Sequence, residues 1–182
     1  TFTIAVTLVD DAPSFAKGSD QTVLENAGAQ SVANWASSIS AGPSNESSQI
    51  LTFAVTNDNN GLFSVQPSIS STGTLTYTPA SNQVGTATVT VRLHDDGGTS
   101  GGGVDSSTAQ TFTINVGVVN HAPSYTSGSN MTVSEDAAAY SAPWATSVSK
   151  GLSNESGQTL TFTVTNDANS LFSTQPSIAA DG

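Results

Sequence analysis

The segment Ala87-Thr-Val-Thr-Val-Arg-Leu93 alternates apolar residues with Thr and Arg. A period of two places successive side chains on opposite faces of an extended chain, so the segment predicts a strand with one buried and one solvated face. Similar alternation is found in the segments Leu51–Val55, Leu75–Tyr77 and Phe112–Val116. Because no segment has a convincing helical period, we expect an all-β fold.

The chain also repeats itself. Ala12-Pro-Ser-Phe15 returns as Ala122-Pro-Ser-Tyr125, and Ser44-Asn-Glu-Ser47 returns as Ser153-Asn-Glu-Ser156. The spacing of about 110 residues is typical of an independently folded domain and is too long for a solenoid unit. We expect each complete repeat to be an antiparallel β-sandwich of roughly seven strands.

The repeat register divides the chain into three parts. Residues 1–9 match the last strand of a repeat, residues 10–119 form a complete repeat, and residues 120–182 form the N-terminal part of the next one. Neither partial repeat can close a core alone. We therefore expect either a longer tandem array or ends completed by strands from neighbouring copies. One strand cannot replace everything that residues 120–182 lack, so continuation of the chain is the favoured interpretation.

The composition excludes several classes of function. Three basic residues against 14 acidic ones give a net charge of −11, which is unsuited to binding nucleic acid. The absence of Cys excludes disulfides, thiolate zinc sites and cysteine nucleophiles. No apolar run approaches the roughly 18 residues of a membrane span, so we expect none in this chain.

Several motifs carry a family resemblance. The segments Val89-Thr-Val-Arg-Leu-His-Asp-Asp-Gly-Gly98, Thr111-Phe-Thr-Ile-Asn-Val116 and Val119-Asn-His-Ala-Pro123 together resemble the end of a bacterial cadherin-like repeat. Thr22-Val-Leu-Glu25 and Thr132-Val-Ser-Glu135 resemble the early Glu motif of that family. The resemblance covers the whole chain. It implies tandem immunoglobulin-like or cadherin-like β-sandwich repeats of the kind found in large secreted adhesins and surface proteins.

The resemblance also suggests calcium at the repeat junctions. Calcium takes about six to eight oxygen ligands, which a linker and two adjacent loops could supply together. The candidate ligands are Asp10, Asp11, Glu25, Asp95, Asp96, Asn120 and Glu135. The alternative is that these are ordinary solvated turn residues. The second junction departs from the family pattern, because His121 stands where the first junction has Asp11.

The histidines and tryptophans are the remaining candidates for catalysis and for sugar binding. His94 and His121 are far apart in sequence, and the first repeat has no counterpart of His121, so we expect no catalytic site. Trp35 and Trp144 occupy equivalent positions in the two repeats. If they were exposed, their rings could stack on sugar rings, but we favour a position in the core for both.

The sequence therefore predicts a non-enzymatic, secreted or cell-surface protein. Its repeats would form a stalk or filament for adhesion or for a biofilm matrix. Its partners would be adjacent repeats, neighbouring copies and cell-surface or matrix glycans. The alternative is a carbohydrate-binding or spacer module of a secreted polysaccharide-degrading enzyme.

Overall fold

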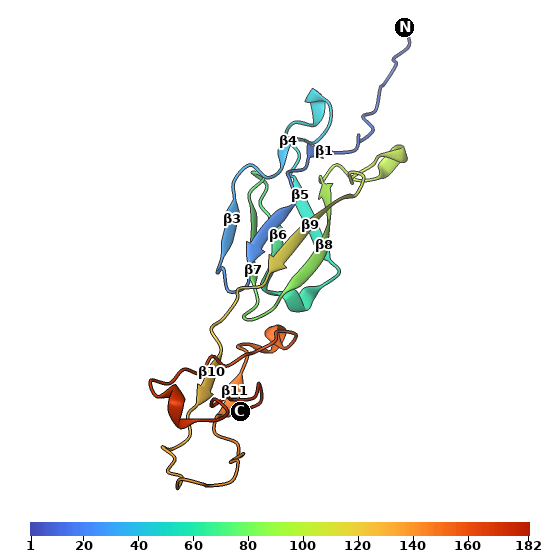
Figure 1. Ribbon diagram of the computed structural model, residues 1–182. Coiled ribbons are helices and arrows are strands. Elements are labelled where there is room, and N and C mark those ends of the chain that lie inside the picture. Colours follow the sequence, from blue (N-terminus) through green and yellow to red (C-terminus); the bar gives the residue numbers. More distant parts are fainter. The chain divides into compact units, whose positions relative to one another are not determined.

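The alternating segments of the sequence form three strands of a four-stranded sheet and the central strand of a three-stranded sheet (Figure 1). In the computed structural model, which describes residues 1–182, the four-stranded sheet has the order β2–β9–β8–β5. The three-stranded sheet has the order β3–β7–β6, and β1 pairs with β4 alone. The strands are β1 Ser14–Ala16, β2 Gln21–Leu24, β3 Gln30–Val32, β4 Ser37–Ser40, β5 Thr52–Asn57, β6 Phe63–Ile69, β7 Leu75–Pro79, β8 Gly85–His94 and β9 Gln110–Gly117.

Burial follows the period of two in β8 and β9. Ala87, Val89, Val91 and Leu93 are fully buried, whereas the Thr and Arg residues between them face outward. Their side chains form one hydrophobic core with residues of the three-stranded sheet, including Tyr77. The expected all-β fold is confirmed, and the helical segments are only short 3-10 turns. No helix is long and apolar enough to span a membrane.

One strand pair differs from the expected antiparallel arrangement. β2 runs parallel to β9, with Thr22 opposite Asn115 and Leu24 opposite Gly117. The prediction of purely antiparallel pairing is therefore wrong for this pair. The alternation of apolar and polar residues determines which face of a strand is buried, but it does not determine whether the strand runs parallel or antiparallel to its neighbour. A long connection between two strands allows them to be parallel. Here some 85 residues separate the two strands in sequence.

The chain divides into two units, Thr1–Val118 (unit 1) and Val119–Gly182 (unit 2). Three 3-10 turns lie in unit 1: η1 Ser44–Glu46, η2 Asn60–Leu62 and η3 Ser100–Gly102. In unit 1, residues 1–9 form no strand and are exposed. Asp10 then lies beside the loop that joins β8 to β9, where the backbone N–H of Val104 donates to the Asp10 carbonyl at 3.1 Å.

Unit 2 contains fewer regular elements. They are β10 Ser124–Thr126, β11 Thr146–Ser149, η4 Ser153–Glu155 and η5 Asn169–Leu171. β10 and β11 form an antiparallel pair, and the Tyr125 ring lies edge-on to Phe162 at 5.1 Å. Large apolar side chains are exposed in this unit, namely Tyr125, Met131, Val133, Tyr140, Leu171 and Phe172.

Candidate cation site at the loop end of unit 1

Four of the predicted ligands gather at one end of unit 1. We call this the loop end; it comprises residues 10–11, 42–50 and 95–105. Gln49 Nε2 donates to Asp10 Oδ1 at 2.6 Å, which ties residue 10 to the segment after η1. The backbone N–H of Ile50 donates to Asp96 Oδ1 at 2.8 Å, and that of Asp11 donates to Glu46 Oε1 at 3.0 Å. Asp95 follows β8 at the same end.

The carboxylates of Asp10 and Asp95 lie close enough to repel each other. Burial raises the pKa of the Asp95 carboxyl, and the charges of Asp10 and Asp105 raise it further, against a hydrogen bond from the Gly97 backbone that lowers it. Asp10 Oδ2 and Asp95 Oδ2 are both buried and have no hydrogen-bond partner. Such a pair requires a proton or a cation to be stable.

Glycines make room for this arrangement. A Cβ at Gly97 would clash with the Asp10 carboxylate and with Gln49 Nε2, and one at Gly103 would clash with Asp10 Cβ. The Gly-rich loop between β8 and β9 therefore packs directly against the carboxylate of Asp10.

The other predicted ligands lie elsewhere. Glu25 follows β2, and its backbone N–H donates to the Gly117 carbonyl at 2.8 Å, at the opposite end of β9 from the loop end. The structure therefore does not bring Glu25 together with Asp95 and Asp96. Asn120 and Glu135 belong to unit 2, where Asn120 Oδ1 accepts a hydrogen bond from Gln158 Nε2 at 2.7 Å and Glu135 is exposed.

Sequence reasoning missed a buried glutamate at the loop end. Glu46 is only 5% exposed, and its Oε2 atom is buried without a hydrogen-bond partner. Gln49 Oε1 is likewise buried and unpartnered. The recurrence of Ser-Asn-Glu-Ser in both repeats was the available signal, but so polar a tetrapeptide is typical of an exposed turn.

Unit 2 places Glu155 in the equivalent position, with a complete set of donors. Glu155 is 2% exposed; its Oε1 accepts from the His121 backbone at 2.7 Å and its Oε2 from the Leu152 backbone at 2.9 Å. His121 Nδ1 lies 3.2 Å from Oε2. The hydrogen bond from the His121 backbone is the main cause that lowers the pKa of Glu155. His121 thus contacts a buried carboxylate and is not a simply solvated residue.

The two histidines and Trp35 have structural partners. Ser106 Oγ lies 2.7 Å from His94 Nδ1, and the two histidines belong to different units. Trp35 is 3% exposed, its ring lies 4.3 Å from that of Phe112, and its Nε1 donates to the Ser19 carbonyl. The predicted core position is confirmed for Trp35, so this ring is not available to stack on a sugar, whereas Trp144 is only half-buried.

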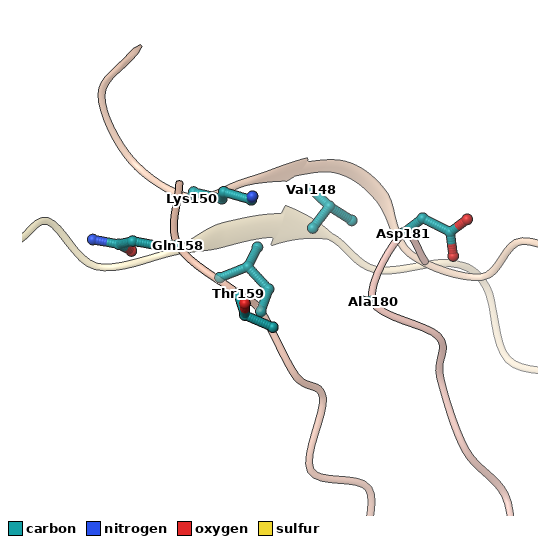
Figure 2. Close-up of a pocket in the computed structure, with 7 residues that line it drawn as sticks. Val148, Lys150, Gln158, Thr159, Ala180 and Asp181 are labelled. Atoms are coloured by element: carbon teal, nitrogen blue, oxygen red, sulfur yellow. The ribbon is translucent and has the colours of Figure 1, made fainter. Parts of the chain in front are cut away.

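Each unit has a shallow hollow in the same place. In unit 2 the hollow measures about 410 Å³ and lies between β11 and the segment from Gln158 to Leu160. In Figure 2, Val148 lies on the strand above the segment that carries Thr159, and Asp181 lies to the right of both. The hollow of unit 1, about 340 Å³, is lined by Ile39, Gln49 and Leu51 among others. Neither gathers a set of groups suited to catalysis.

The candidate site therefore consists of two carboxylates, a buried glutamate and an amide at the loop end. Nowhere in the chain do three or more His, Asp or Glu side chains converge in a group that could hold a metal ion. Calcium ligands are not limited to carboxylates and imidazoles, because amide oxygens, backbone carbonyl oxygens and water also bind calcium. The chain matches no model of a known protein family, and a search of curated proteins found no significant match.

Proposed function

We propose that this chain is a structural part of an extracellular adhesin, stalk or filament built from tandem immunoglobulin-like or cadherin-like β-sandwich repeats. The observation that supports this proposal most is that the same local contacts occur in both units. Trp35 Nε1 donates to the Ser19 carbonyl at 2.9 Å, and Trp144 Nε1 donates to the Ser129 carbonyl at 3.1 Å. The repeated sequence is thus accompanied by repeated side-chain anchoring.

A second repeated contact joins the strand β5 region to the β6 region. Asn57 Nδ2 donates to Gln66 Oε1 at 2.9 Å, and Asn166 Nδ2 donates to Gln175 Oε1 at 2.8 Å. These shared details support the proposal that the two units are built on one plan. Tandem units of one plan suit a protein whose role is to provide length, because the distance spanned grows with each added unit.

The topology of unit 1 suits a load-bearing role. The chain enters at Asp10, before β2, and leaves after β9. Because β2 and β9 are parallel neighbours, tension between entrance and exit pulls them in opposite directions along their length. This loads their hydrogen bonds in shear, so that several must break together, whereas peeling would break them one by one.

Calcium at the loop end is part of the proposal. The buried unpartnered oxygens of Asp10, Asp95 and Gln49 favour an oxygen-ligated cation, which would stiffen the entrance to unit 1. The net charge of −11 would keep neighbouring copies apart in the extracellular space. The role is mechanical and involves no catalytic step.

Single-molecule force spectroscopy of the whole chain, held at its two ends, tests the load-bearing role. We expect a discrete unfolding event of roughly 35 nm, the extended length of about 100 residues. Val23→Pro, which disrupts β2 pairing, should lower the force of this event. Ser71→Pro, in the exposed turn before β7, is the matched control and should leave the force unchanged. A wild-type chain that extends without a force peak would contradict the proposal.

A further inference from the structure

The turn before β6 contains the only Asn-Gly pair in the chain, at Asn60 and Gly61. The backbone nitrogen that follows an Asn can attack the side-chain carboxamide of that Asn. Gly hinders this attack least, because it has no Cβ and its backbone moves most freely. In unit 2 the equivalent pair is Asn169 and Ser170. The two repeats therefore differ at a position that bears on the chemical stability of the chain.

The structure leaves both reacting groups of this pair accessible. Asn60 and Gly61 are exposed and begin the short turn η2. The hydrogen bonds of this turn use the carbonyls of Asn59 and Asn60, and none involves the Asn60 carboxamide or the Gly61 backbone N–H. A Cβ placed on Gly61 would meet nothing closer than Asn59 Oδ1 at 4.0 Å, so the space around the nitrogen is open.

Other asparagines of unit 1 have carboxamides that are held in place. Asn57 Nδ2 donates to Gln66 Oε1 at 2.9 Å, and Asn26 Nδ2 donates to Asn82 Oδ1 at 3.0 Å. Asn57 and Asn26 are also each followed by a residue that has a side chain. Asn60 differs from both in its free carboxamide and in its neighbour, so it is the asparagine best placed to react.

We propose that Asn60 is a site of spontaneous deamidation. The Gly61 nitrogen, once it has lost its proton to hydroxide, forms a bond to Cγ of Asn60. The Cγ–Nδ2 bond then breaks, and Nδ2 takes a proton from water and leaves as ammonia. Water opens the resulting succinimide ring at either of its two carbonyls, which gives aspartate or isoaspartate at this position. The exchange of ammonia for water adds one negative charge and raises the mass by about 1 Da.

Isoaspartate would weaken the turn that leads into β6. The Asn60 carbonyl accepts the backbone N–H of Phe63 and, at 3.0 Å, Nε2 of Gln66. In isoaspartate the main chain runs through the former side chain, so this carbonyl becomes a free carboxylate and loses its place in the turn. The turn also positions the buried side chains of Leu62 and Phe63. We therefore expect the isoaspartate form of unit 1 to melt about 4 °C lower than the intact chain.

Peptide mapping by mass spectrometry of the full chain, aged in mildly alkaline buffer, tests the proposal. Asn169 is the internal control, because it is exposed and begins the equivalent turn η5. We expect Asn60 to deamidate roughly tenfold faster than Asn169, which is a barrier lower by about 1.4 kcal/mol. The rate should rise with pH, because the Gly61 nitrogen must lose its proton. Both aspartate and isoaspartate peptides should appear, since direct hydrolysis of the carboxamide would give aspartate alone.

Two glycine variants make the test specific. Gly61 has no left-handed φ and has open space around it, so Gly61→Ala should fold like the wild type. It should slow the reaction of Asn60 roughly tenfold, because the added Cβ hinders the attack. Gly157→Ala, at an exposed and equally open glycine of unit 2, is the matched control and should leave that rate unchanged.

The proposal is overturned if Asn60 reacts no faster than Asn169, or if Gly61→Ala leaves the rate at Asn60 unchanged. The same conclusion follows if the product contains no isoaspartate. The force measurement on the stalk role does not depend on any of these results.

Discussion

Neighbouring acidic residues of unit 1 have opposite environments. Asp96 Oδ1 accepts a backbone hydrogen bond from Ile50 at 2.8 Å. Burial and the charges of Asp10 and Asp105 instead raise the pKa of Asp95. Because the pKa of Asp95 is higher in the folded state than in the unfolded chain, its negative charge opposes folding when no cation is bound.

We expect Asp95→Asn to raise the melting temperature in chelator by about 2–4 °C, because the neutral amide removes repulsion from Asp10 and Asp105. In calcium the same variant should lose part of the stabilisation, since a ligand charge is gone. Asp96→Asn keeps the acceptor for Ile50 and should change the melting temperature in chelator little. A lower melting temperature for Asp95→Asn in chelator would show that the negative charge is favourable without metal.

Sequence reasoning placed some of these residues correctly and missed others. The sequence predicts Asp10, Asp11, Glu25, Asp95 and Asp96 as ligands at a junction, and the structure places all of them except Glu25 at the loop end. Glu46 was missed because its burial depends on a hydrogen bond from Asp11, 35 residues away in sequence. A polar turn motif does not reveal such a tertiary contact.

The strands differ in how fully they are paired. β8 and β9 share a register that runs from Gly85 opposite Val116 to Val91 opposite Gln110, and each has a neighbour on both sides. β1 pairs with β4 alone, and its register shifts between Ser14 and Ala16. The alternating pattern predicted β5, β7, β8 and β9, because a half-buried face leaves a clear period of two. The short strands β1 to β4 carry weaker alternation and were not individually predicted.

Hydrogen exchange of the full chain followed by mass spectrometry checks this ranking. Peptides that cover Gly85–His94 and Gln110–Gly117 should exchange most slowly, because their amides are paired on both sides or buried. Peptides that cover residues 1–9 and 127–143, which contain no strand, should exchange within the shortest labelling time. Equal protection of β1 and β8 would contradict the strand pairing described here.

At the scale of the whole molecule, unit 1 has a small but continuous core. The core residues come from both sheets and include three aromatic contacts, one of them between Phe63 and Tyr77 at 6.0 Å. Unit 2 exposes Leu171 and Phe172, whereas their counterparts Leu62 and Phe63 are buried in unit 1. The sequence repeat predicted that these residues occupy corresponding positions in the two units. It did not predict that β2 and β9, which lie near the points where the chain enters and leaves unit 1, are parallel neighbours.

We propose that residues 10–118 are one self-contained repeat, and unfolding of that fragment alone tests this claim. Circular dichroism of residues 10–118 should show β-structure with negligible helix. Heating should give a single cooperative transition, because both sheets share one core. A helical spectrum, or a gradual loss of signal with no transition in either calcium or chelator, would contradict the claim.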